Sequence, residues 1–312
     1  MKNLHRSLVI GCSALALAGC GADDIASPGG TGVVINQPAT PAPTPTPGPT
    51  PTPTVSAPDI CPNLTNDGSV QLTNAGTISG PTGSYRICQL PSLITKSVEL
   101  PRIAGVLYGM NGRVDVGCDG GFSAPSAGSP YNSTTIGCGT LTADTGVTLS
   151  IAPGVILIGQ TGQSWLAVNR GNKINAVGTA DKPIIFTSRQ NIEGSVSADS
   201  SGQWGGIILS GRAPVTDCFV GSEAANTCQR RVEGATNQIL YGGTQTGDSS
   251  GSLTFVQIRF SGFALSNGDE LQSLTTGGVG SGTTLENIMT YNSSDDGAEF
   301  FGGNVHGRRF IM

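Results

Sequence analysis

The run Thr284-Leu-Glu-Asn-Ile-Met-Thr-Tyr291, followed by Asn292-Ser-Ser-Asp-Asp-Gly-Ala-Glu-Phe-Phe-Gly-Gly303, joins a short β-like segment to an acidic turn and a glycine pair. The same layout of apolar run, polar turn and glycine recurs upstream from about residue 146. Such repetition is typical of stacked β architectures, in which each repeat buries its apolar side against its neighbours. The sequence therefore predicts a repetitive β domain that carries the acidic turn on its surface.

Apolar residues alternate with polar ones in short runs throughout residues 141–312, as strands require. Three pairs of apolar residues are spaced by 21 to 23 positions: Ile184 and Ile207, Leu253 and Leu274, Ile288 and Ile311. A sandwich or propeller would need antiparallel hairpins, and two-residue Asn-Gly or Asp-Gly loops are scarce between these runs. We expect an all-β fold, a right-handed single-stranded parallel β-helix (a solenoid).

The composition excludes several classes of protein. The 312 residues include 47 glycines and 19 prolines, and only 12% are charged, which disfavours a helical protein. The formal net charge of −5 becomes −7 without residues 1–19, with 14 basic against 21 acidic residues. A nucleic-acid partner is not expected, because phosphate binding needs clustered Lys and Arg. No apolar stretch after residue 20 is long enough to span a bilayer.

Residues 1–19 have the features of a signal peptide, a basic start and an apolar segment from Leu8 to Leu17. The sequence Leu17-Ala-Gly-Cys20 resembles the lipobox of bacterial lipoproteins, which implies that Cys20 carries the lipid (palmitate) anchor. Gly21, in place of an aspartate, resembles the outer-membrane pattern. The alternative is an ordinary secretory signal with a chance cysteine. Residues 20–58 form a Pro/Thr-rich linker that is expected to be disordered or extended, because proline lacks an amide donor.

Residues 59–140 are loop-rich and are expected to form a disulfide-bearing N-terminal cap. Outside the signal peptide and lipidation site six cysteines remain, an even number that indicates disulfides in an exported protein. Of fifteen possible connectivities, we favour the sequential one: Cys61–Cys88, Cys118–Cys138 and Cys218–Cys228. A zinc site is the rival interpretation, but there is no C-x-x-C pair and His306 is the only histidine beyond residue 19.

Several motifs stand out within about residues 141–312: Ala152-Pro-Gly-Val155, Asn169-Arg-Gly-Asn-Lys-Ile174, Gly178-Thr-Ala-Asp-Lys-Pro-Ile-Ile-Phe-Thr-Ser188, Trp204-Gly-Gly-Ile-Ile-Leu-Ser-Gly211, Arg231-Val-Glu-Gly234, Gly277-Gly-Val-Gly-Ser-Gly-Thr-Thr284 and Asp295-Asp-Gly-Ala-Glu-Phe-Phe-Gly-Gly303. In these motifs the chain resembles the right-handed parallel β-helix lipoproteins and secreted proteins of Gram-negative bacteria. Such proteins are often encoded beside TonB-dependent receptors, which implies a receptor partner. They usually continue past the last motif, so we expect this β-helix to be truncated at its C-terminal end.

Acidic residues gather in the later repeats, where stacking would bring their side chains together: Asp248, Asp269, Glu270, Asp295, Asp296 and Glu299. Three interpretations stay open. The carboxylates bind Ca²⁺, a pair of them acts as acid and base on a glycosidic bond (candidates Asp295, Asp296 and Glu299), or they occupy turns because Asp and Asn suit turn geometry. Arg308 and Arg309 are a weaker suggestion for the base of a lyase, by analogy with β-helix lyases.

Two main functions follow from these residues. The first is an outer-membrane-anchored ligand-binding module that captures a polysaccharide or a cation complex for a TonB-dependent receptor, on the periplasmic side or at the cell surface. The second is a calcium-dependent polysaccharide lyase or hydrolase that uses the surface carboxylates. A purely structural role in the envelope is a third. Trp165 and Trp204 either stack on sugars or fill coil corners.

Overall fold

The computed structural model describes residues 55–65, 67–233, 239–266 and 269–312, within the compact unit Pro51–Met312. The signal peptide, Cys20 and the linker up to residue 54 lie outside these residues. One short helix, α1 (Arg189–Glu193), interrupts the strands. Ser188 accepts a hydrogen bond from the Asn191 amide N–H at 3.1 Å, which caps the first turn of α1. Within the described residues no helix has the length and apolar character to cross a membrane.

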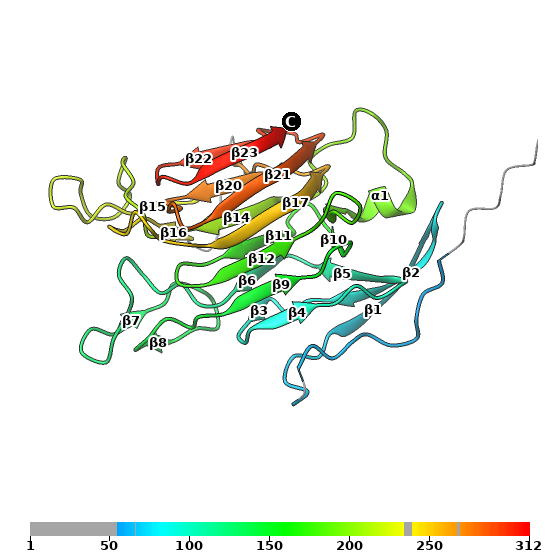
Figure 1. The fold of residues 1–312 in the computed structure, drawn as a ribbon, viewed down its shortest axis with the longest axis horizontal. Coiled ribbons are helices and arrows are strands. Elements are labelled where there is room, and N and C mark those ends of the chain that lie inside the picture. Colours follow the sequence, from blue (N-terminus) through cyan, green and yellow to red (C-terminus); the bar gives the residue numbers. More distant parts are fainter. Residues whose placement is uncertain (1–54, 66, 234–238, 267–268) are drawn as a thin grey trace, which may run out of the picture. The chain divides into compact units, whose positions relative to one another are not determined.

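Parallel strands build three faces, which the chain visits in the order B, C, A (Figure 1). Face A contains β4 (Val98–Leu100), β9 (Thr148–Ile151), β12 (Lys173–Val177) and the first parts of β17 (Gly251–Arg259), β21 (Thr284–Tyr291) and β23 (His306–Ile311). Face B contains β2 (Gly83–Gln89), β5 (Val106–Met110), β10 (Ile156–Gly159), β13 (Ile184–Ser188) and the second parts of β17, β21 and β23. Face C contains β3 (Leu93–Ile94), β6 (Arg113–Val116), β11 (Trp165–Val168), β14 (Gly206–Ser210), β20 (Leu274–Gly277) and β22 (Ala298–Phe301). Neighbouring strands within each face pair in parallel, which confirms the predicted parallel β-helix.

Inward-pointing residues of successive coils stack in register and form the core. On face A one such row runs through Leu100, Ile151, Ala176, Leu253 and Leu285, and none of these side chains is more than 3% exposed. Burying an aliphatic side chain of this size stabilises the fold by about 1.5–3 kcal/mol. The alternation of apolar and polar residues therefore settles which side of each strand faces inward.

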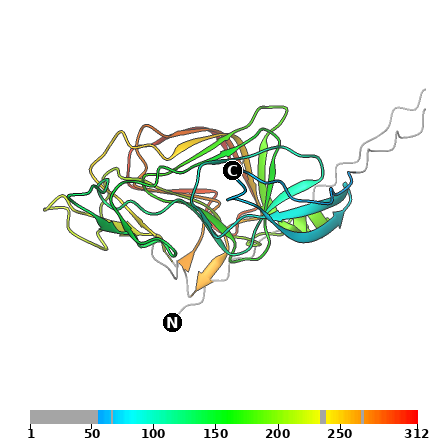
Figure 2. The ribbon, with the colours of Figure 1, turned by 90° about the horizontal axis from the view of Figure 1, so that it is seen from below.

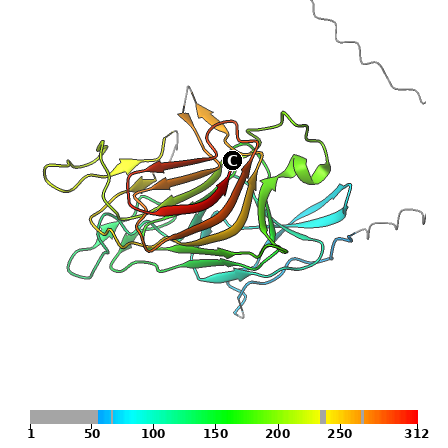
Figure 3. The same cartoon turned by 45° about the horizontal axis from the view of Figure 1, so that its top comes forward.

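The corner between faces A and B changes along the stack. Earlier coils turn there through short loops, residues 101–105, 152–155 and 178–183. In the last coils a single residue with positive φ makes the turn: Phe255 (50°), Asn287 (54°) and Arg309 (54°). The register places these three residues above one another, between paired neighbours on both sides. The last strands curve side by side as they pass from face A to face B (Figure 3). Positive φ is uncommon for residues other than glycine, so the stack imposes this conformation.

The observed strand register corrects the prediction that residues 21 to 23 positions apart stack on one another. Ile184 and Ile207 lie in β13 and β14, on different faces of one coil, and Leu253 and Leu274 likewise lie in β17 and β20. Residues that do stack are farther apart, because insertions lengthen the coils: Ile184 pairs with Val256. In the last coil Ile288 stacks on Phe310, one residue before the partner that the spacing indicated.

Parallel stacking begins before residue 141. Strands β2, β5 and β6 already pair in parallel with their successors, so the coils extend to about residue 83. Before them, β1 (Thr73–Gly80) pairs antiparallel with β2, and Cys61, Val70 and Leu72 join the main core at this end of the stack. The three disulfides are Cys61–Cys88, Cys118–Cys138 and Cys218–Cys228, the pairs expected from the sequence.

Insertions leave the stack at the other two corners. Residues 117–147 carry the hairpin of β7 (Tyr131–Asn132) and β8 (Thr140–Leu141). The insertion after β14 carries the antiparallel pair β15 (Arg230–Arg231) and β16 (Leu240–Tyr241). The hairpin of β18 (Ala264–Ser266) and β19 (Asp269–Glu270) projects from the stack between β17 and β20 (Figure 2). The surfaces available to a ligand are therefore the exteriors of the faces and the regions beside these insertions.

Candidate functional site

The predicted carboxylates do not all meet, because they lie at opposite ends of face C. Asp248 lies near the C-terminal ends of the face C strands, just past β14. There its Oδ2 accepts a hydrogen bond from the backbone N–H of Arg212 at 2.9 Å. Asp295 precedes β22 at the start of the strands, and its Oδ2 accepts from Gln272 Nε2 at 3.1 Å. The same amide donates to the backbone oxygen of Glu270 at 3.3 Å. The expectation that all these turns stack on one wall is therefore wrong for Asp248. The Asp269 side chain lies outside the described residues.

Glu299 forms an acidic group with residues from the neighbouring insertion. Burial raises the pKa of Glu299, and the charges of Glu233, Asp295 and Asp296 raise it further, while Arg230 lowers it. Its Oε2 atom is buried and has no hydrogen-bond partner among the described residues. A carboxyl group whose pKa is raised in this way is suited to donate a proton.

Arg230 lies at the centre of this group. Its Nη2 is 3.1 Å from an oxygen of Asp217 and 3.8 Å from one of Glu233, and its guanidinium lies over the Phe301 ring at 5.1 Å. Asp295, Asp296 and Glu299 are close along the chain, and their spacing alone suggests an acidic group. Arg230 and Glu233 come from the insertion after β14, so no local pattern indicates that they belong to it.

The described residues contain one set of three potential metal ligands whose ligand atoms lie within 4.8 Å of one another: Cys218, Glu223 and Cys228. The two cysteines are joined in a disulfide, so their sulfurs are not free to bind a cation. The carboxylates singled out in the sequence do not form such a set within the described side chains. A calcium ion at Glu299, Asp295 and Asp296 would need further oxygen ligands from backbone or water.

The exterior of face A is a polar surface that the sequence did not single out. One row crosses six strands in register and consists of Glu99, Ser150, Asn175, Ser252, Thr284 and His306, all of them at least partly exposed. We call it the face A row. The sequence feature that could have indicated this row is the alternation of polar and apolar residues along each strand. In β12, for example, the residues are exposed, buried, exposed, buried and exposed in turn. It presents hydroxyl, amide and charged groups to solvent.

A polar hollow of about 270 Å³ lies at the C-terminal end of the face A row. It is lined by Ser281, Thr283, Thr284, Leu285, Glu286, His306 and Arg308. Glu286 lies opposite Arg308 in the register but forms its ion pair with Arg309, which also donates to Asn287 Oδ1 at 2.8 Å. Within the described part of the chain Arg308 has no ion-pair partner. The hollow therefore combines a cation, a carboxylate, a histidine and hydroxyl groups.

The two tryptophans belong to the folded scaffold. Trp204 is fully buried and donates a hydrogen bond from Nε1 to the Arg259 carbonyl at 2.8 Å. Trp165 is 5% exposed and packs in the cluster between face C and its insertion. Both indoles fill the interior of the protein, and their burial leaves no face on which a sugar could stack.

Two ion pairs that the sequence did not indicate, one buried and one partly buried, hold the insertions on the stack. Arg170, which is fully buried, makes two hydrogen bonds of 2.7 Å to Asp119 and one of 2.7 Å to Gln229. Arg212 contacts both oxygens of Asp144, at 2.6 and 2.8 Å. These planar bidentate contacts orient both loops at the same corner.

The sequence profile of the pectate-lyase-like β-helix domain matches residues 132–312, more than half of the chain. The protein belongs to this family. Comparison with curated proteins and with solved structures gives no match. Membership agrees with the parallel coils, and it leaves the ligand and any reaction to be inferred from the surfaces.

Proposed function

We propose that this protein is a carbohydrate-binding β-helix module that holds an extended polysaccharide across the exterior of face A. The observation that supports this most directly is the face A row, an unbroken file of polar side chains across six paired strands. Family membership agrees with the proposal, since pectate-lyase-like β-helix domains are compatible with carbohydrate binding.

The geometry of the row suits a linear polymer. Adjacent strands are about 4.8 Å apart, so the row repeats its donors and acceptors at that interval along the stack. Sugar hydroxyls both donate and accept hydrogen bonds, as do the side chains of Ser150, Asn175, Ser252 and Thr284. The hollow at Glu286, His306 and Arg308 adds charged groups at one end. A ligand with hydroxyls along its length and a charged group is expected to bind best.

The location that we propose rests on the sequence. Lipidation at Cys20 would anchor the protein to the outer membrane, on its periplasmic side or at the cell surface, and the Pro/Thr-rich linker would hold the β-helix away from the lipid. A polysaccharide or cation complex held on face A would then be near a TonB-dependent receptor. Mass spectrometry of the envelope protein tests the anchor, because Cys20→Ser should abolish the lipid adduct.

Binding to a glycan array, followed by titration of the best ligand, tests the proposed function. We expect Asn175→Ala and Thr284→Ala each to weaken binding several-fold, since each removes hydrogen bonds worth about 0.5–1.5 kcal/mol. Gln245→Ala, an exposed polar substitution in the insertion over face C, is the matched control and should bind as wild type. Equal binding by all three variants would place the ligand elsewhere.

A hydrolase or lyase is the second candidate, and the raised pKa of Glu299 is the observation in its favour. In this alternative Glu299 donates a proton to the leaving oxygen, and Asp295 or Asp296 acts as base. Ca²⁺ bound by the same carboxylates is a further proposal for a lyase, in which the cation would neutralise an acidic sugar.

Cleavage of the bound glycan separates the two candidates. If the protein is an enzyme, new chain ends should appear with time, and Glu299→Gln and Asp296→Asn should abolish them without loss of binding. Removing Ca²⁺ with a chelator then distinguishes a calcium-dependent lyase from a hydrolase. Binding without product, with or without added Ca²⁺, would support the module without catalysis.

A further inference from the structure

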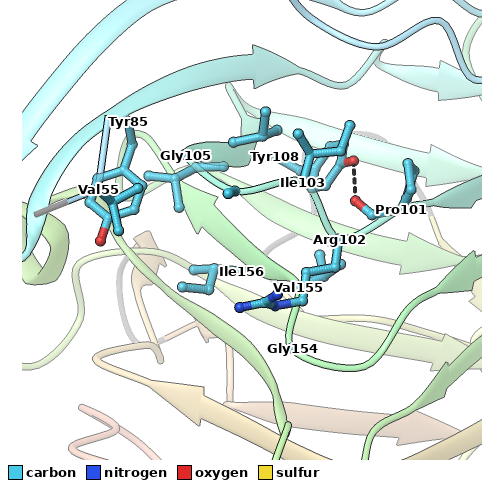
Figure 4. A pocket seen from close by; sticks show the side chains of 13 residues that line it. Val55, Tyr85, Pro101, Arg102, Ile103, Gly105, Tyr108, Gly154, Val155 and Ile156 are labelled. Atoms are coloured by element: carbon cyan, nitrogen blue, oxygen red, sulfur yellow. Dashed lines mark hydrogen bonds between the residues drawn. The ribbon is translucent and has the colours of Figure 1, made fainter. Parts of the chain in front are cut away.

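A separate hollow of about 180 Å³ lies at the opposite end of the stack, at the corner between faces A and B (Figure 4). Three segments meet there: residues 101–108, residues 154–156, and Val55 with Tyr85. None of these residues belongs to the face A row or to the acidic group. We call this hollow the corner pocket.

Aliphatic side chains form part of the walls of the corner pocket, and the two tyrosine hydroxyls at its edge have hydrogen-bond partners. Ile103, Val106, Val155 and Ile156 supply aliphatic surface. The buried Tyr108 donates its hydroxyl to the Pro101 carbonyl at 2.6 Å, as the dashed line in Figure 4 marks. The second tyrosine hydroxyl is also satisfied, because Tyr85 lies 2.7 Å from the Thr82 hydroxyl. The Tyr108 proton is therefore already used within the protein.

Arg102 is the charged group of the corner pocket. It is exposed, and within the described residues it takes part in no ion pair. Its side chain extends along Val155 toward Ile156, across one side of the pocket (Figure 4). Gly154 passes beneath it with φ 79°, where a Cβ would lie 2.9 Å from Arg102 Cδ and Nε. The positive φ accounts for a glycine at this position, and the Arg102 side chain lies against it.

The far rim of the pocket is fixed by the segment that enters the β-helix from the linker. Val55 donates its N–H to Thr82 at 3.2 Å and accepts from the Ser84 N–H at 2.8 Å. Three residues later, the Pro58 carbonyl accepts from Arg86 Nε at 2.9 Å. These bonds hold Val55 in place as a wall, so the pocket is formed before a ligand arrives.

We propose that the corner pocket binds a small monocarboxylate with an apolar body, whose carboxylate pairs with Arg102. Guanidinium matches a carboxylate in a planar, bidentate pair, and it is the charged group of the pocket that lacks a partner. The aliphatic walls favour an apolar body and disfavour a hydroxylated one, which would lose hydrogen bonds to water. This site is independent of glycan binding on face A.

Titration calorimetry with benzoate, benzamide and glucuronate on the full chain tests the proposal. Benzoate is expected to bind with a Kd on the order of 1 mM, as its small size allows. Benzamide tests the charge and glucuronate tests the apolar body, and each is expected to bind at least about tenfold more weakly. If benzamide equals benzoate, or if glucuronate binds more tightly, the proposed ligand class is wrong.

Variants test the assignment to Arg102. Arg102→Gln is expected to weaken benzoate at least about tenfold, and Ile156→Glu should do the same by placing a competing carboxylate in the pocket. Arg189→Gln, an exposed arginine substitution on α1, is the control and should leave benzoate binding unchanged. Circular dichroism confirms that each variant is folded. Unchanged binding by a folded Arg102→Gln variant, or no binding by wild type at about ten times the expected Kd, overturns the proposal.

Discussion

Faces A and C have the same parallel architecture but opposite exteriors. On face C the outward row Asp115, Ala167, Ile208 and Thr275 is no more than 5% exposed, because inserted loops cover it. On face A the corresponding row is polar and accessible from Glu99 to His306. The covered face gains an apolar cluster of its own, which includes Trp165, Ile208 and Tyr241. Among the described residues, the exterior of face A has no such cluster.

The difference separates stability from binding. Substitutions beneath the insertions remove packing or leave charges buried, which costs several kcal/mol. Substitutions on the exterior of face A remove exposed side chains, and their effect on stability is expected to be small. The polar residues in register on the exterior of face A are therefore free to contact the proposed ligand.

The largest effect is expected at the buried arginine that holds the insertions on the stack. Arg170→Met leaves Asp119 buried without its partner, which should lower the free energy of unfolding by about 3–5 kcal/mol. Urea unfolding measures this change. Arg189→Gln breaks an exposed ion pair and should change stability by less than about 1 kcal/mol. Comparable losses in both variants would contradict the structural role of Arg170.

The disulfides of the two insertions should contribute next. The double variant Cys118→Ser and Cys138→Ser opens a bridge with a sequence separation of 20 and is expected to lose about 3 kcal/mol. The equivalent change at Cys218 and Cys228, with a separation of 10, should lose about 0.5 kcal/mol less. Denaturant unfolding without reductant gives both values. A larger loss at the shorter bridge would show that packing, and not chain entropy, dominates.

The acidic group should make stability depend on pH. Because burial raises the pKa of Glu299, the folded state favours the protonated carboxyl. Its stabilising contribution is present at low pH and is lost as the pH rises through the folded-state pKa. Glu299→Gln carries no charge, so at pH 7 it should unfold at a higher temperature than wild type, with a smaller difference near pH 4. Thermal scans that show the opposite order at pH 7 would contradict the burial of this charge.

The smallest effect on stability is expected on the open face. Asn175→Ala removes an exposed side chain, so the free energy of unfolding should change by less than about 0.5 kcal/mol. The same variant should lose glycan affinity, as proposed above. A large loss of stability at Asn175 would mean that face A is covered in solution, and it would remove the contrast with face C.

Much of the fold was accessible from the sequence, for reasons visible in particular strands. The alternation in β12, Lys173-Ile-Asn-Ala-Val177, predicts its buried and exposed sides correctly. Coil length was not accessible, because insertions such as residues 117–147 separate residues that stack. The 23-residue interval between Ile184 and Ile207 separates two faces of one coil and not two stacked strands. The sequence cannot distinguish these cases, because strands on different faces have the same apolar pattern as stacked ones.

The candidate sites divide in the same way. Asp295, Asp296 and Glu299 are close in sequence, and in the folded protein the charges of the two aspartates raise the pKa of Glu299. Asp248 could not be separated from them without knowing which end of face C its loop reaches. The partner Arg230 and the pair Arg170–Asp119 depend on contacts between distant segments, which no local pattern encodes.

The residues Phe255, Asn287 and Arg309, which turn the chain directly from face A to face B, have a consequence for how such a protein can diversify. A corner made by one residue fixes the length of chain between the two faces, so an extra residue there would move the following side chains of that strand to its opposite side. In these last coils the longer loops lie at the other corners, as they do beside face C. The strands of face A therefore keep a constant spacing along the stack, while the loops at the other corners can differ in length and sequence.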